Sequence, residues 1–179
     1  MTRERIDLRA LIEACIRQSD ATARSAGIGV ALDVPASLPA MRGDARRLAQ
    51  AFSHLLSNAV KFSEIGGKIR IRASLEKTGP EKLGGEKSGD LLIVVRDSGI
   101  GIPAADLQRV LEPFTQSDST LSRRFQGAGL GLYIARALIE AHDGTLTLHS
   151  RPGAGTTAEI RLPRARLEPT APASLKEIP

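Results

Sequence analysis

The chain has 179 residues, of which 41% are hydrophobic and 25% charged, as in a soluble globular domain with a sizeable core. The net charge of +5 comes from interspersed acids and bases, and one Tyr, four Phe and no Trp offer few rings for base stacking, so nucleic acid is not an expected partner. The sequence has no signal-peptide pattern and no apolar run near the roughly 20 residues that span a bilayer. This segment is therefore expected to be cytoplasmic without membrane contact, although its parent protein could be membrane-anchored.

The first predicted element is an amphipathic helix after the polar residues 1–5. Asp7 is a suitable N-cap, and Gly27 ends the helix just after Ala26. The single cysteine, Cys15, lies on the apolar face and is interpreted as a core residue, because one cysteine cannot form an internal disulfide. The alternating segment 28–34 then predicts a strand, which could lie at a sheet edge.

The second predicted helix, "DARRLAQAFSHLLSNAVKF" (44–62), carries an unusual polar row. Its apolar residues recur at helical spacing: Leu48, Phe52, Leu55, Leu56, Ala59 and Phe62. At about 100° per residue, His54, Asn58 and Lys61 fall within an arc of roughly 60° beside this stripe. Asn is a poor residue inside a helix, since its amide competes for backbone hydrogen bonds. From this helix alone, a polar boundary row and a functional surface are both open.

The later elements complete an α+β pattern. The predicted strands are 66–75, 91–97 (buried on both faces), 145–150 and 156–162, with a helix at 129–141 and one or two helical turns near 104–111. The glycine-rich loop 76–90 lacks the Gly-Lys-Ser/Thr of a P-loop. The long irregular stretch 98–127 is typical of functional segments. Together these elements predict one mixed sheet covered on one face by helices.

Two glycine-rich segments carry the strongest chemical signals. In "DSGIGIP" (97–103), Asp97 ends a buried strand, where a carboxylate needs hydrogen-bond donors, and an ordinary turn is the competing interpretation. In "GAGLGL" (127–132), three glycines precede a helix whose free N–H groups and dipole favour an anion. A tightly packed helix cap is the alternative there, and Arg123 just upstream strengthens the anion interpretation.

Five segments in chain order resemble the conserved boxes of the ATP-binding catalytic domain of sensor histidine kinases: "HLLSNAVKFS", "DSGIGIP", "LEPFTQ", "RRFQGAGLGL" and "DGTLTLHSRPGAGTT". These catalytic domains belong to a superfamily that also includes gyrase, mismatch-repair ATPases and heat-shock chaperones. The resemblance implies a Bergerat fold: a two-layer α/β sandwich with a mixed, mainly antiparallel five-stranded sheet covered on one face by three helices. It implies a catalytic domain at 6–163 with an ATP lid at about 103–126, flanked by a polar leader at 1–5 and a disordered Pro-rich tail at 164–179.

The same resemblance assigns the site residues. The implied ATP contacts are Asn58, Lys61, Phe62, Asp97, Gly99, Gly101, Ile102, Phe114, Arg123, Gly127, Gly129, Leu130 and Gly131. Asn58 would coordinate Mg²⁺, whose preferred ligands are oxygens, and Lys61 would contact the phosphates. Asp97 would accept from the adenine amino group, so ATP should bind better than GTP.

The remaining residues have supporting roles in this assignment. Gly99 and Gly101 would let the purine lie against the backbone, between apolar walls that include Phe62 and Ile102. Phe114 would anchor the lid. The glycines Gly127, Gly129 and Gly131 would wrap the phosphates, with Arg123 as a charge partner. Either Thr156 or Thr157 would lie near the adenine.

The chain departs from the family pattern at three positions. His54 stands where most sensor kinases have another asparagine and gyrase-like ATPases have a glutamate base, so autonomous ATP hydrolysis should be weak. Three roles of His54 stay open: contact with the metal, contact with the phosphates, and simple packing. Gln126 and Ala128 replace residues usual in the last glycine-rich box, which bears on lid movement and one phosphate contact.

No phosphoacceptor motif of the His-Glu-x-x-x-Pro kind occurs in the chain. The implied enzyme is therefore a protein histidine kinase that transfers the γ-phosphoryl group of MgATP to a histidine on a separate dimerisation domain. That domain would then pass the phosphoryl group to a response-regulator receiver domain. The isolated chain should be a monomer without autophosphorylation. The alternatives are a degenerate ATP-binding regulatory module and an anti-sigma-type serine kinase, and "LEPFTQ" argues against the latter.

Overall fold

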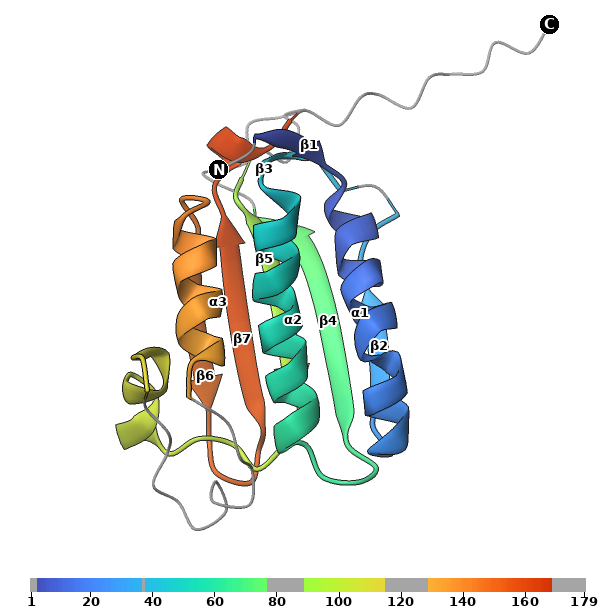
Figure 1. Cartoon of the computed structure of the whole chain (residues 1–179), viewed down its shortest axis with the longest axis vertical. Helices are drawn as coiled ribbons and strands as arrows, with labels where there is room; N and C mark the ends of the chain where they lie inside the picture. Colours follow the sequence, from blue (N-terminus) through green and yellow to red (C-terminus); the bar gives the residue numbers. More distant parts are fainter. Residues whose placement is uncertain (1–2, 37, 77–88, 115–128, 169–179) are drawn as a thin grey trace, which may run out of the picture.

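The computed structural model describes residues 3–36, 38–76, 89–114 and 129–168. In this part of the chain a five-stranded sheet has one face covered by three α-helices (Figure 1). The strands are β1 (Glu4–Ile6), β2 (Gly29–Asp33), β3 (Met41–Gly43), β4 (Lys68–Leu75), β5 (Leu91–Asp97), β6 (Thr145–Ser150) and β7 (Thr156–Leu162). The helices are α1 (Leu8–Ser25), α2 (Ala45–Phe62) and α3 (Gly131–Glu140), with 3₁₀ helices at Ala104–Asp106, Arg109–Leu111 and Arg164–Arg166.

The main sheet has the strand order β2-β4-β5-β7-β6, and β1 pairs with β3 in a separate two-stranded sheet. The pair β2–β4 is parallel, whereas the other three pairs are antiparallel. This arrangement confirms the predicted mixed, mainly antiparallel sheet with its helices on one face. It also places β2 at the sheet edge, as its sequence suggested.

The two long helices begin where their capping residues predict. The Asp7 carboxylate accepts from the backbone N–H of Ala10 at 3.0 Å, and that of Asp44 accepts from Arg47 at 3.1 Å. Each cap satisfies one N–H that has no partner within its helix. Gly27, with φ of +68°, follows the end of α1 in the left-handed conformation typical of helix termination.

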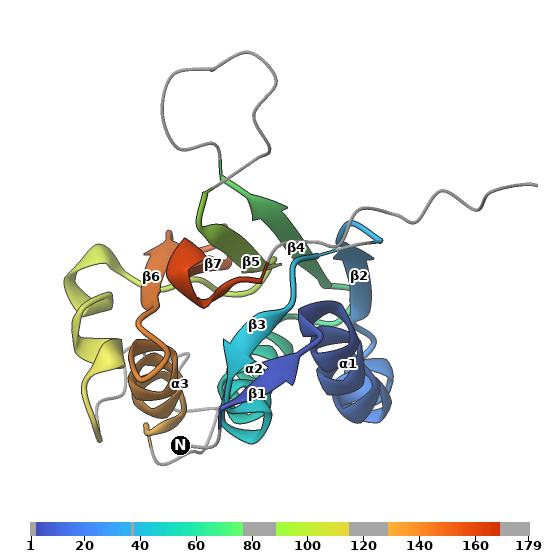
Figure 2. The same cartoon turned by 90° about the horizontal axis from the view of Figure 1, so that it is seen from above.

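The core lies between the sheet and the helix layer (Figure 2). Strand β5 contributes Leu91, Ile93 and Val95, all buried, but the alternate residues Leu92 and Val94 are only half-buried. The prediction that this strand is buried on both faces was therefore wrong. The helices cover only one face of the sheet, and the short apolar run of β5 gave no indication of which face would stay open.

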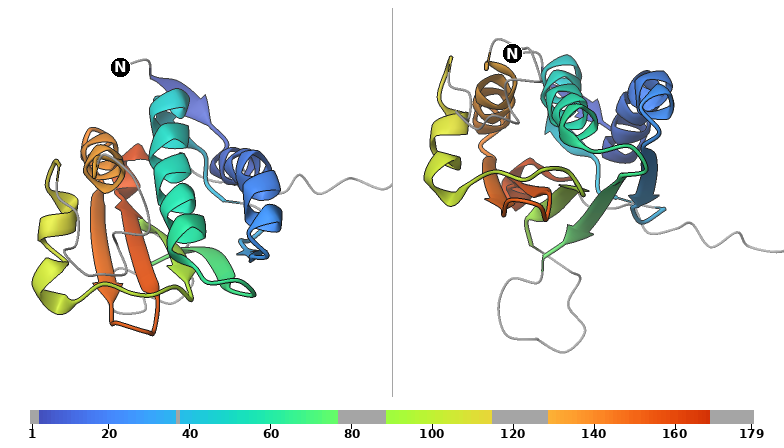
Figure 3. Two further views of the ribbon diagram at one scale, coloured as in Figure 1. Left: turned by 60° about the horizontal axis from the view of Figure 1, so that its bottom comes forward. Right: turned by 90° about the horizontal axis from the view of Figure 1, so that it is seen from below.

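The segment after β5 forms two short 3₁₀ helices where one or two helical turns were predicted. Figure 3 shows that this segment lies beside β6 and α3, at the edge of the sheet opposite β2. Val110 is buried there, which ties the segment to the core. The second half of the expected lid, residues 115–126, lies outside the described residues.

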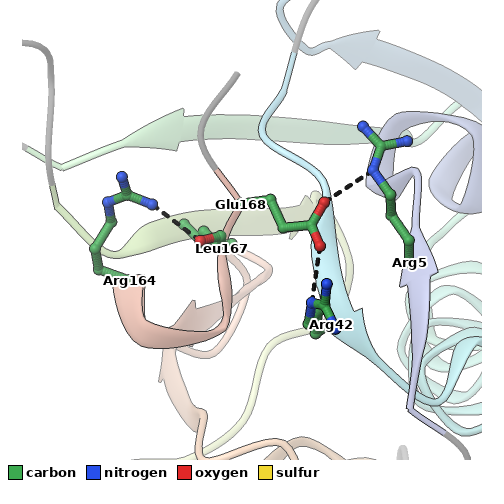
Figure 4. Close-up of polar contacts among 5 residues, drawn as sticks. All are labelled: Arg5, Arg42, Arg164, Leu167 and Glu168. Carbon is green, nitrogen blue, oxygen red and sulfur yellow. Dashed lines mark hydrogen bonds and ion pairs between the residues drawn. The ribbon is translucent and has the colours of Figure 1, made fainter. Parts of the chain in front are cut away.

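Both expected ends of the domain take part in the fold. Glu4 and Arg5 of the predicted polar leader belong to β1, which pairs with β3, between the predicted strand 28–34 and the predicted helix 44–62. Of the expected disordered tail, Leu167 is buried and bridges to Met41, and Glu168 accepts from Arg5 and Arg42 (Figure 4). The ordered domain therefore extends to at least residue 168, whereas residues 169–179 lie outside the described part.

Cys15 is buried on α1, and its Sγ lies 3.6 Å from the carbonyl oxygen of Ala49 on α2. Burial raises the pKa of the thiol, and a hydrogen bond with Ser53 opposes that change. These contacts agree with its interpretation as a core residue. No helix among the described residues has the length and apolar composition needed to cross a bilayer.

Candidate functional site

The polar row of α2 faces the beginning of α3. His54, Asn58 and Lys61 are all half-buried on the flank of the helix. A Cβ atom placed on Gly131, the first residue of α3, would lie 3.6 Å from Asn58 Nδ2 and 3.6 Å from His54 Nδ1. The structure thus brings together side chains of one predicted segment and the glycine-rich start of another. His54 and Asn58 thus lie between two helices and not on a solvent-facing strip.

The start of α3 has the properties of an anion site. Unlike α1 and α2, it has no side-chain cap, so among the described residues its first N–H groups are not satisfied by a capping side chain. The helix dipole adds positive potential at the same point. Gly129, with φ of +67°, holds the left-handed backbone conformation just before Leu130. An anion such as a phosphate would be bound at this helix start, beside Asn58.

His54 has an unusual environment. Its Nε2 atom is buried and makes no hydrogen bond with any part of the chain that the structure describes. Burial lowers the pKa of the imidazole, so the ring is neutral at physiological pH. A buried ring nitrogen without a partner is costly unless a ligand or water satisfies it. The structure therefore favours a role toward a ligand over simple packing.

Asp97 ends β5 beside the β6–β7 turn. Its Oδ1 atom accepts two backbone hydrogen bonds, from Gly99 at 2.9 Å and from Thr156 at 3.0 Å. Burial raises the pKa of the carboxyl, and these hydrogen bonds partly oppose the effect. Because both bonds go to one oxygen, the second oxygen can accept from a ligand. That is the function expected for a group that recognises an exocyclic amine.

The choice between the two threonines is decided by the strand register. Thr156 donates its backbone N–H to Asp97, whereas Thr157 pairs with Arg96 on the opposite face of the sheet. Successive side chains of a strand point to opposite faces, so only Thr156 lies on the side of Asp97. The sequence shows two adjacent threonines without indicating which of them faces the site.

Gly99 and Gly101 are required by close backbone packing. A Cβ atom on Gly99 would lie 2.3 Å from the Phe62 carbonyl oxygen, and one on Gly101 would lie 1.9 Å from that of Arg151. Ile100, between them, donates to Phe62 at 3.1 Å. The two glycines thus hold this loop between the end of α2 and the β6–β7 turn. This reason for their presence was not part of the sequence interpretation, which assigned their free space to a purine.

The apolar residues expected around the base differ in their surroundings. Phe62 and Ile102 are half-buried, and the ring of Phe62 lies beneath the ammonium group of Lys61, 5.1 Å from its centroid. Phe114, in contrast, is 79% exposed with φ of +61°, and its expected role as anchor of the lid stays a prediction. Sequence could not reveal this exposure, because an anchor requires a partner surface. Arg123, Gln126, Gly127 and Ala128 lie outside the described residues.

Ser150 is a site residue that the sequence interpretation missed. Its hydroxyl accepts from the Ile102 N–H at 2.8 Å, donates to the Gly155 carbonyl at 2.7 Å and lies 2.9 Å from the Thr156 hydroxyl. It thereby fixes the loop after Asp97 to the β6–β7 turn. Apart from ending an alternating strand, Ser150 has no feature in the sequence that marks this role.

The described residues fit a magnesium site only in combination with a nucleotide. No group of three or more His, Cys, Asp or Glu side chains in this part of the chain could hold a metal ion. Mg²⁺ is commonly bound by one or two protein oxygens, substrate phosphates and water. The Asn58 amide lies beside the uncapped start of α3, within about 4 Å of where a Gly131 side chain would begin. That arrangement suits a metal shared with phosphates.

Comparison with known proteins agrees with this geometry. Residues 43–166 match the family described as histidine kinase-, DNA gyrase B-, and HSP90-like ATPase. The chain is 39% identical over 161 residues to the non-motile and phage-resistance protein of Caulobacter vibrioides, covering 89% of this chain and 18% of that protein. It is 42% identical over 133 residues to the sensor histidine kinase RcsC of Salmonella typhimurium, covering 73% of this chain and 12% of that protein. The chain thus spans less than a fifth of either relative.

Solved structures show the same fold. The mycobacterial sensor histidine kinase MprB aligns with a TM-score of 0.72 and 26% identity, covering 90% of this chain and 97% of that one. Full-length ShkA in complex with AMPPNP aligns with a TM-score of 0.74 and 28% identity, covering 91% of this chain and 31% of that one. The chain therefore belongs to the family of histidine kinase-, DNA gyrase B- and HSP90-like ATPases, and it is similar to the matching segment of sensor histidine kinases.

Proposed function

We propose that this domain binds ATP together with Mg²⁺ and transfers the γ-phosphoryl group to a histidine on a separate dimerisation domain. The observation that carries the proposal is the position of His54 and Asn58 against Gly131 at the uncapped start of α3. This places an amide oxygen, a neutral imidazole and helix N–H groups around one point. Phosphoryl transfer depends mainly on such positioning and charge stabilisation.

The residues would divide the work as follows. Asp97 accepts from the adenine amino group, which selects ATP over GTP, and Thr156 holds the carboxylate in place. Lys61 and the N–H groups of α3 bind the phosphates. Bound Mg²⁺ would neutralise charge on the phosphate oxygens.

We assign the magnesium ligand to Asn58 and not to His54, because Mg²⁺ prefers oxygen over imidazole ligands. The buried Nε2 of His54 is then suited to a hydrogen bond with a phosphate oxygen or a bound water. The acceptor histidine would come from another domain of a longer protein or from another chain, with a receiver domain downstream. We place the reaction in the cytoplasm, where ATP is available.

The first test is calorimetric titration of the chain with ATP, with and without Mg²⁺. Asn58→Ala should remove the gain in affinity that Mg²⁺ gives, a loss of about tenfold or more, because the amide oxygen is the proposed ligand. Gln50→Ala, which removes an exposed amide from the same helix, is the matched control and should leave the gain unchanged. If Asn58→Ala keeps the full Mg²⁺ effect, the metal assignment is wrong.

The second test asks whether phosphate is transferred. The chain would be incubated with γ-labelled ATP and with the sensor histidine kinase RcsC of Salmonella typhimurium from which the matching segment has been deleted. Acid-labile, base-stable label on the added protein is the expected result, since phosphohistidine has that stability. Tight ATP binding without any label on a competent acceptor would favour the alternative, a regulatory ATP-binding module without phosphotransfer.

A further inference from the structure

The face of the main sheet away from the helices carries a row of basic residues. The three helices lie on one side of the sheet, and the other side is free of them (Figure 2). On that side Arg70, Arg96, Thr157 and His149 stand in register across β4, β5, β7 and β6. We call these four residues, with Arg151 just after β6, the basic row. It lies at the same end of β5 as Asp97 but on the opposite face.

Several charged residues of this face form pairs with each other. The pairs are Arg72 with Asp33 at 2.9 Å and Arg161 with Glu76, and His149 of the basic row lies 3.7 Å from Glu159. A solvated sheet face is normally arranged in this way, with both signs interspersed. Such pairs leave little net charge over most of the face. A cluster of charged side chains without partners on this face is therefore a candidate binding surface.

Arg70, Arg96 and Arg151 form such a cluster. None of the three side chains makes an ion pair or a hydrogen bond with any residue in the described part of the chain. Arg70 and Arg96 are, moreover, directly opposite each other in antiparallel register. Like charges at opposite positions destabilise a sheet. An electrostatic repulsion that no other part of the fold relieves is expected at sites where function requires the two charges.

The shape of this region favours an extended ligand. Arg96 and Arg151 line an open depression of about 360 Å³ together with His149 and Thr157. Small-molecule sites are usually more enclosed and more apolar than this depression. The row also continues beyond it to Arg70, and four neighbouring strands span about 14 Å, roughly the length of four extended residues. The row contains no Phe, Tyr or Trp side chain on which nucleic-acid bases could stack.

We propose that the basic row is a docking surface for an acidic segment of a partner protein, whose carboxylates pair with Arg70, Arg96 and Arg151. Guanidinium groups bind carboxylates in a two-pronged geometry, and such a partner would relieve the repulsion between Arg70 and Arg96. The site of Asn58 and Gly131 lies in the helix layer, on the other side of the sheet. The surface therefore stays accessible when a nucleotide is bound, and the proposal does not depend on phosphotransfer.

The test uses a fluorescently labelled hexaglutamate peptide as the probe, titrated with the chain in about 50 mM and about 300 mM NaCl. The double variant Arg70→Gln/Arg96→Gln should bind the peptide about fivefold to tenfold more weakly at low salt, as expected for the loss of two exposed charge pairs. Its thermal stability should be equal to or higher than that of the wild type, because a like-charge pair has been removed.

The matched control is Arg17→Gln/Arg46→Gln, which removes the same charge from α1 and α2 in the helix layer. It should bind the peptide like the wild type, and Asn58→Ala should as well. Equal losses in the two double variants would show attraction to net charge alone and overturn the proposal. So would inorganic phosphate that displaces the peptide at millimolar or lower concentration, because the basic row would then be a small-anion site.

Discussion

At the scale of single residues, Gly101 and Gly153 have the same left-handed backbone but different surroundings. Their φ angles are +72° and +74°. A Cβ atom on Gly101 would lie 1.9 Å from the Arg151 carbonyl oxygen, whereas one on Gly153 would meet nothing within 4 Å. Alanine substitutions at the two glycines therefore separate the free-energy cost of the left-handed conformation from that of the steric contact.

Gly153→Ala should lower the free energy of unfolding by about 1–2 kcal/mol, the cost of placing an ordinary residue in this conformation. Gly101→Ala should cost at least about 3 kcal/mol, because the loop must also move away from the β6–β7 turn. Urea denaturation of the two variants measures both values. Similar costs for the two substitutions would mean that the loop after Asp97 adjusts easily.

Asp97 gives the fold a defined pH dependence. Burial raises the pKa of its carboxyl above the ordinary value of 3.8, so the folded chain holds this proton to a higher pH than the unfolded chain does. Relative to Asp97→Asn, the wild type should be most stable below that ordinary value. The stability of the wild type relative to Asp97→Asn should diminish as the pH rises through the raised pKa, because the folded state must then bury a charge.

Denaturant titrations of wild type and Asp97→Asn between about pH 3 and pH 7 would follow this difference, with the uncharged variant as the reference. A difference in stability that is constant across the range, or that grows as the pH rises, would contradict the role of burial at Asp97.

At the scale of elements, the site depends on the relative position of α2 and α3, which His142 fixes at the far end. This side chain is fully buried after the last turn of α3. Its Nδ1 donates to the Leu138 carbonyl at 2.8 Å, and its Nε2 accepts from the Asp44 N–H at the start of α2 at 3.0 Å. Gly43 makes room for the ring, since a Cβ there would lie 2.7 Å from His142 Cδ2.

Replacement of His142 by Phe should keep most of the volume but leave the Asp44 N–H without its partner, at a cost of about 1–3 kcal/mol. His149→Phe is the control, because His149 is exposed on β6 and should tolerate the change. Chemical denaturation gives both values. Equal effects of the two substitutions would indicate that the helix-to-helix hydrogen bond contributes little.

At the scale of the whole molecule, Glu168 joins three separate parts of the chain. It accepts from Arg5 of β1 at 2.9 Å and from Arg42 of β3 at 2.8 Å (Figure 4). Leu167 beside it is buried, and Arg164 donates to the Leu167 carbonyl at 3.0 Å. Residues at the end of the described chain thereby close the two-stranded sheet over one end of the core.

Glu168→Gln should lower the melting temperature slightly at neutral pH and low salt, because it removes both ion pairs. The hydrogen bond from Arg5 is the main reason that the pKa of Glu168 lies below its ordinary value of 4.5. The stabilisation is therefore present above that ordinary value and lost as the pH falls through the lowered pKa. The difference in melting temperature should also shrink in about 1 M NaCl. An effect that persists in both acid and salt would not be electrostatic.

The sequence by itself determined the elements and the chemistry they carry. Helix periodicity placed His54, Asn58 and Lys61 in one row, and the end of an apolar strand singled out Asp97. The capping residue Asp7 likewise gave the start of α1. These signals are local, because hydrophobic spacing and capping depend on residues only a few positions apart.

Only the tertiary structure decided how the elements meet. It exposed Phe114, turned Thr156 and not Thr157 toward Asp97, and made Ser150 a link between two loops. It also left the outer face of β5 open and placed Arg70 opposite Arg96. Strand register and the coverage of a face depend on contacts between residues far apart in the chain, and the alternation of a single strand does not encode them.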